Sequence, residues 1–130
     1  MHAAQSLNQD SIIPHILLGA ESALQKAMVA IAAISIVFGL MEHEVGCGSD
    51  VAAVARLGCR AAGDALKDCR DHASLGDIIG VIDCLACAVS AHRTAKNLFL
   101  AIVELGDADV AEKAQLGVAL AESVLNDLGA

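Results

Sequence analysis

The fold is decided by residues 59–92, which read CRAAGDALKDCRDHASLGDIIGVIDCLACAVSAH. The pattern predicts the end of one helix, a short break at residues 73–75, and a second helix that runs back beside the first. Because the break is short, the two helices are antiparallel neighbours. This stretch also holds most of the chemistry of the chain, namely four of the five cysteines and two of the five histidines: Cys59, Cys69, Cys84, Cys87, His72 and His92.

Outward from this stretch, the sequence predicts helices at about residues 12–44, 51–72, 75–105 and 108–128. Gly46 suits a left-handed helix end, and Ser49 or Asp50 suits the first position of the next helix. Gly106 and Asp107 mark the last stop and start in the same way. Four helices with short connections predict an all-α fold, an antiparallel up-down four-helix bundle. We expect a single domain over residues 1–130, with residues 1–10 disordered and without an internal repeat.

Hydrophobic residues make up 56% of the chain, and the mean hydropathy is +0.61. Residues 27–41 carry no charge, but this run of 15 residues is shorter than the roughly 20 that a membrane-spanning helix needs. It is therefore interpreted as a buried core helix, and a membrane location is not expected. Since the run is apolar on every face, a bundle of four helices leaves one of its faces uncovered. We expect a homo-oligomer, a homodimer, that covers this face.

The formal net charge is −8 and the isoelectric point is about 4.8. This charge disfavours nucleic acid, which is bound through Lys and Arg, and also disfavours an anionic membrane surface. The first residues, MHAAQSLNQD, do not resemble a secretory signal peptide. We expect a cytoplasmic protein, in which cysteines stay reduced and serve as metal ligands, redox groups or core residues.

Cys84 and Cys87 are the first candidates for a binding site. At i and i+3 on one helix they are neighbours, and two thiolates can bind Cu(I) or share Zn(II) with further ligands. Cys69 is expected to point into the core near Cys84, close to the turn, and Cys59 to lie at the edge of the core face. The alternative is that all four are small buried residues, as free cysteines often are, in a non-catalytic structural or adaptor protein.

His92 follows Cys87 by five residues at the edge of the core face, where a hydrogen-bonded role is commoner than a ligand role. A third interpretation is a thiol oxidoreductase that uses Cys84 and Cys87. It is disfavoured because the pair lies in mid-helix, away from a helix N-terminus that would lower a thiol pKa. The spacing offers no Ser-His-Asp triad and no phosphate-binding loop, so an enzyme is not expected.

The stretch from about Cys59 to Leu105, and ASLGDIIGVIDCLACAVSAHRTAKNLF in particular, resembles the cysteine-rich four-helix-bundle copper-storage family. That resemblance implies Cu(I) held in the bundle core by inward thiolates. The implied ligands are Cys59, Cys69, Cys84 and Cys87, with His92 as a further ligand near a bundle end. Family members carry many more cysteines. The positions that would continue their pattern are alanines here: Ala62, Ala88, Ala91 and Ala95.

Overall fold

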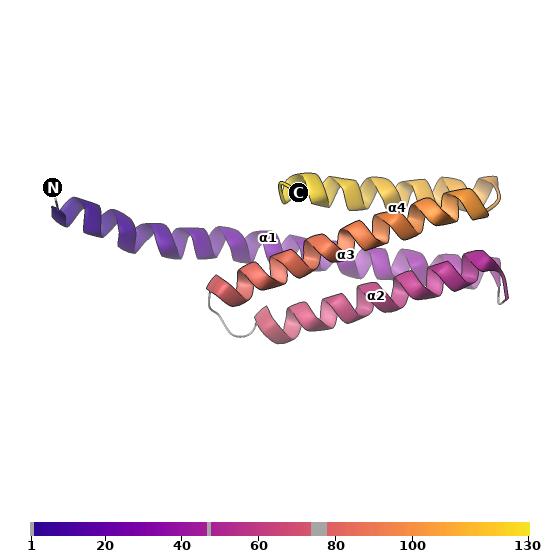
Figure 1. Cartoon of the computed structure of the whole chain (residues 1–130), viewed down its shortest axis with the longest axis horizontal. Coiled ribbons are helices and arrows are strands. Elements are labelled where there is room, and N and C mark those ends of the chain that lie inside the picture. Colours follow the sequence, from indigo (N-terminus) through magenta and orange to yellow (C-terminus); the bar gives the residue numbers. More distant parts are fainter. Residues whose placement is uncertain (1, 47, 74–77) are drawn as a thin grey trace.

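A computed structural model shows four helices in sequence, α1 (His2–Val45), α2 (Asp50–Ala73), α3 (Ile78–Leu105) and α4 (Ala108–Asp127). The structure describes the backbone of residues 2–46, 48–73 and 78–130, and the side chains of residues 15–46, 48–71 and 78–130. Consecutive helices run in opposite directions (Figure 1), and the described residues contain no strand. The predicted all-α, antiparallel up-down four-helix bundle is confirmed.

Local signals set the helix ends as the sequence predicts. Gly46 has φ 77°, the left-handed conformation that ends α1. The Ser49 hydroxyl accepts a hydrogen bond from the Ala52 N–H at 3.0 Å, and the Asp107 carboxylate accepts one from the Val110 N–H at 3.0 Å. These side chains satisfy amide groups that have no partner within the first turn of a helix. By residue type, Ser74 or Asp77 is predicted to cap the third helix, and Cys47, which stands between two glycines, is predicted to be exposed. These three residues lie outside the described ones.

The first helix begins at His2, ten residues before the predicted start at Ile12. The helix continues through Pro14, a residue whose place in the predicted helix 12–44 would be the first turn, where proline is tolerated. Residues 2–13 contain no glycine or proline, so no strong helix breaker separates them from the rest of α1. At about 1.5 Å per residue, α1 is about 66 Å long, and its N-terminal end extends well past the other helices (Figure 1). The expected disorder of residues 1–10 stays a prediction about the protein in solution.

The core lies between two hairpins, α1–α2 and α3–α4. The rings of Phe38 on α1 and Phe99 on α3 stack at its centre, with 4.0 Å between their centroids. α1 and α3 each contact the other three helices, and α1 and α4 share the fewest contacts of any touching pair. The bundle is therefore closed along the α2–α3 seam and more open along the α1–α4 seam.

The two hairpins repeat one another in sequence, which corrects the expectation of a chain without a repeat. Residues 50–68 of α2 and 109–127 of α4 align without a gap and are identical at nine of nineteen positions, including Gly58 with Gly117. An offset of 61 residues relates α1 to α3 with few identities, but it superposes most of their buried positions and places Phe38 on Phe99. We use the term equivalent positions for residues related by these two offsets.

The two hairpins also share the same packing contact between a phenylalanine and a glycine. A Cβ on Gly58 would lie 2.6 Å from the Phe38 ring, and a Cβ on Gly117 would lie 2.6 Å from the Phe99 ring. Each hairpin thus presses its phenylalanine onto a glycine of its second helix. The buried positions of α2 and α4 also coincide almost throughout these stretches. The bundle therefore consists of two equivalent helical hairpins packed through their phenylalanines.

Among the described residues, two helical segments, His15–Val45 and Ile78–Leu105, are long and apolar enough to cross a membrane by length and composition. Core helices of soluble bundles pass the same test, and Ile31, Phe38 and Phe99 in these segments are buried between helices. The expectation of a protein away from the membrane therefore stays a prediction.

Candidate thiol site

Three of the predicted site residues meet where α2 ends and α3 begins. Cys69 and Cys84 are buried across the seam from one another, with 0% and 3% of their surface exposed. The Cys69 thiol donates to the Cys84 carbonyl at 3.7 Å, and the Cys84 thiol donates to the Cys69 carbonyl at 3.8 Å. The short connection after α2 predicts this pairing, because it brings the last turns of α2 beside the first turns of α3.

Cys87 lies one turn beyond Cys84 and is half-buried. Its side chain joins those of Cys69 and Cys84 in lining a pocket of about 250 Å³ that opens to the surface. Asp68 and Asp83, which precede Cys69 and Cys84 in the sequence, complete the lining. Three cysteines and two aspartates therefore line one small space.

Burial, together with the smaller repulsive effects of the nearby Cys87 and Cys84 thiols, raises the pKa of the Cys69 thiol to about 12. The pKa of Cys84 is also raised, first by burial and then by Cys87 and Asp83. At neutral pH both thiols are therefore protonated. This is the opposite of a redox-active cysteine, whose pKa is lowered so that the thiolate can attack.

Cys59 does not join the other three thiols. It faces α1, where its sulfur lies 3.6 Å from the Ser35 hydroxyl, and a Cβ on Gly39 would lie 3.8 Å from it. Ten residues separate Cys59 from Cys69 along α2, a distance of about 15 Å. The structure thus places Cys59 in the α1–α2 seam, about three helical turns along α2 from the pocket.

His92 is fully buried, not at the edge of the core face as the sequence suggests. Its Nδ1–H donates to the Ala88 carbonyl at 2.7 Å, while its Nε2 has no hydrogen-bond partner among the described residues. Burial lowers the pKa of the ring, which favours the neutral form. Eight residues separate His92 from Cys84, about 12 Å along α3, so the imidazole lies apart from the thiol pocket.

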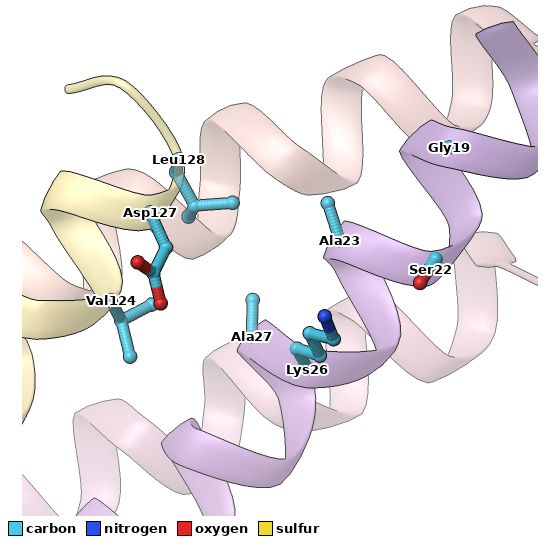
Figure 2. A pocket seen from close by; sticks show the side chains of 8 residues that line it. All are labelled: Gly19, Ser22, Ala23, Lys26, Ala27, Val124, Asp127 and Leu128. Atoms are coloured by element: carbon cyan, nitrogen blue, oxygen red, sulfur yellow. The ribbon is translucent and has the colours of Figure 1, made fainter.

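The α1–α4 seam contains a pocket at the equivalent positions (Figure 2). It lies between α1 and the end of α4, with Ala23 and Lys26 on one side and Asp127 and Leu128 on the other. In this pocket Leu128 takes the position of Cys69, Ala23 that of Cys84 and Lys26 that of Cys87. The same framework therefore forms without sulfur, and packing alone does not require the three cysteines. The internal repeat is the sequence signal from which these two equivalent pockets could have been predicted.

Among the described residues, no three His, Cys, Asp or Glu side chains are arranged as a ready metal-binding group. In the pocket, the thiols of Cys69 and Cys84 point to backbone carbonyls of the opposite helix. Binding of a metal would therefore require these side chains to rotate about χ1 and to lose their protons.

Comparisons with protein-family models, with curated proteins and with solved structures find no match for this chain. The resemblance to the copper-storage family therefore stays a prediction. The class of protein defined so far is a four-helix bundle built from two equivalent hairpins, with a thiol pocket at the end of one seam.

Proposed function

We propose that the protein binds one Cu(I) ion per chain in the pocket lined by Cys69, Cys84 and Cys87. The observation that carries this proposal is the contrast between the two equivalent pockets. The equivalent positions hold three cysteines in the α2–α3 seam and Leu128, Ala23 and Lys26 in the α1–α4 seam. Since the framework does not require sulfur, a role for the sulfur atoms themselves is favoured over core packing.

The donor set favours Cu(I) over Zn(II). Thiolates are soft ligands that suit Cu(I), which two or three sulfur atoms satisfy. Structural Zn(II) is almost always bound by four ligands, and Cys59 and His92 lie too far along their helices to complete such a set. On binding, Cu(I) replaces the protons of the thiols that hold it, and the protons leave to water. Asp68 and Asp83 at the pocket add negative charge that attracts a cation.

The thiol oxidoreductase is a weaker candidate. The pKa of Cys84 is raised, so the attacking thiolate that such an enzyme needs is scarce at neutral pH. A non-catalytic module with cysteines as core residues remains the second candidate, and the uncovered face of α1 is the observation that favours it.

The test is a titration of the reduced protein with Cu(I) under anaerobic conditions against a competing chelator, followed by native mass spectrometry. Uptake of one Cu(I) per chain is expected. The variant Cys69→Leu/Cys84→Ala/Cys87→Lys, which copies the residues of the equivalent pocket, is expected to fold and to lose the copper. Cys59→Val, which copies Val118, is the matched control and is expected to keep it. Equal uptake by the triple variant, or none by the wild type, would contradict the proposal.

A further inference from the structure

An apolar stripe runs along the outward side of α1. Its positions follow one another at alternating spacings of four and three residues, the spacing of a coiled-coil seam. The residues are Ser22, Lys26, Val29, Ala33, Ile36, Leu40 and His43. All of them except Ala33 are exposed, and the three largest apolar ones, Val29, Ile36 and Leu40, expose 65%, 62% and 63% of their surface.

The equivalent stripe of α3 shows that the fold does not require this apolar surface. The residues of α3 at the equivalent positions are mostly polar: Asp83, Cys87, Ser90, Thr94, Asn97, Ala101 and Glu104. Both stripes lie on the outward sides of equivalent helices, but only the stripe of α1 carries Val, Ile and Leu at its centre. An exposed apolar stripe of this kind, on a helix whose equivalent is polar, marks a surface that is covered by a partner.

The apolar surface continues from α1 to α4. Leu40 lines a groove of about 670 Å³ together with Leu116 and Leu120 of α4. Leu116 is 69% exposed, and the ion pair between Glu44 and Lys113 crosses between the two helices at the same groove. The few contacts between α1 and α4 leave this groove open, so the surface offered to a partner is wider than one helix.

We propose that a second copy of this chain covers the stripe, with the two α1 helices antiparallel about a two-fold axis between Ala33 and Ile36. In this register Val29 packs against Leu40 of the second copy, and Ala33 packs against Ile36 of the second copy. A small residue thus meets a large one at the centre, which lets the helices approach closely.

The charges at the two ends of the stripe favour a second copy of this chain as the partner, with its α1 helix antiparallel. Lys26 lies at one end of the stripe, and Glu44 lies beside His43 at the other. In this register Lys26 of each copy lies opposite His43 of the other and beside Glu44, whereas a parallel pair brings Lys26 to Lys26. Opposite charges across such a pair set the orientation of the helices. The charges of the stripe are therefore complementary to those of a second copy only when the two α1 helices are antiparallel.

Sedimentation velocity over a range of protein concentrations tests the dimer. The wild type is expected to be a dimer. The variant Val29→Ser/Ile36→Asn/Leu40→Ala is expected to be a folded monomer, because it copies Ser90, Asn97 and Ala101, which the fold carries at the equivalent positions. Leu57→Ser on α2 removes an equally exposed leucine away from the stripe and is expected to leave the dimer intact. Circular dichroism checks that each variant keeps its helices.

Carbodiimide cross-linking of a mixture of ¹⁵N-labelled and unlabelled protein tests the direction. A mixed-isotope link between Lys26 and Glu44 is expected. Within one chain these residues are about 27 Å apart along α1, too far for a direct amide bond. The Lys113–Glu44 pair provides the intramolecular control for the reagent.

Four results would overturn the proposal. These are a wild type that stays monomeric at every concentration, a dimer that survives the triple substitution, a dimer without the Lys26–Glu44 link, and a monomer that instead partitions through this stripe into neutral lipid vesicles. The last result would assign the surface to a membrane. None of these measurements involves copper, so the dimer and the proposed metal site succeed or fail separately.

Discussion

The ring of Phe38 lies flat against the ring of Phe99, with 4.0 Å between the centroids and 5° between the planes. Behind each ring is a glycine of the adjoining helix, Gly58 behind Phe38 and Gly117 behind Phe99. Each ring is therefore held between a backbone on one side and the other ring on the opposite side. This contact joins the two equivalent hairpins at the centre of the bundle.

Substitution of Gly58 by Ala is expected to destabilise the fold. The new Cβ would lie 2.6 Å from the Phe38 ring, and this ring cannot retreat because Phe99 stacks on its other face. Overpacking of a core costs about 1–3 kcal/mol, from which the better helix propensity of Ala recovers up to about 1 kcal/mol. Urea unfolding is expected to show a net loss of about 1–2 kcal/mol.

Gly63→Ala is the matched control for this substitution. Gly63 is an exposed residue of the same helix, and no atom lies within 4 Å of a Cβ placed there. The change is expected to raise the free energy of unfolding by about 0.5–1 kcal/mol. Equal effects of the two substitutions would show that the Phe38–Gly58 contact does not constrain the packing.

Substitution of His92 by Ile is expected to stabilise the protein and to reduce its sensitivity to acid. Ile31 occupies the equivalent position in α1, so the site suits a residue of this shape. The change removes a buried Nε2 that has no partner among the described residues, a group that costs about 1–3 kcal/mol when it is left unsatisfied. Thermal unfolding at neutral pH is expected to show a gain of about 1 kcal/mol.

The pH dependence of the stability follows from the direction in which burial shifts the pKa of His92. The pKa of His92 in the fold is lowered from its ordinary value of 6.5, so the unfolded chain binds more protons than the folded one as the pH falls below 6.5. The lowered pKa of His92 therefore costs the fold no stability above this pH and progressively more stability below it. The wild type is expected to lose more stability than His92→Ile between pH 7 and pH 5. Parallel losses would show that His92 is not the acid-sensitive group.

The apparent affinity for Cu(I) is expected to rise with pH. Cys69, with a pKa of about 12, and Cys84, with a raised pKa, are both protonated between pH 6 and 8. If both bind as thiolates, two protons leave for each Cu(I), and the affinity rises by roughly a hundredfold per pH unit. Competition titrations at pH 6.5 and 7.5 measure this slope. An affinity independent of pH would exclude these two thiols as ligands.

Much of the fold follows from local signals in the sequence. Gly46, Ser49, Gly106 and Asp107 set the ends of the helices within one or two residues, because left-handed glycines and side-chain caps act locally. The meeting of Cys69 with Cys84 also follows from the short turn between their helices.

The positions of Cys59 and His92 could not be predicted in the same way. A helical wheel separates the core side of α2 from its solvent side, but does not tell which neighbouring helix each core residue faces. Cys59 faces α1, whereas Cys69 faces α3. His92 is fully buried in the core, as is Ile31, the residue at the equivalent position of α1. The internal repeat could have predicted the burial of His92, but few residues are identical between α1 and α3, so the repeat is hard to recognise there.

The most direct test of the copper site is the X-ray absorption spectrum of the protein loaded with one Cu(I) per chain. The proposal predicts a first coordination shell of two or three sulfur atoms, a spectrum that His92→Ile leaves unchanged, and its loss in Cys69→Leu/Cys84→Ala/Cys87→Lys. A first shell that contains nitrogen and changes in His92→Ile would contradict the proposed ligands. A wild-type protein that releases all of its copper to the competing chelator would contradict the site itself.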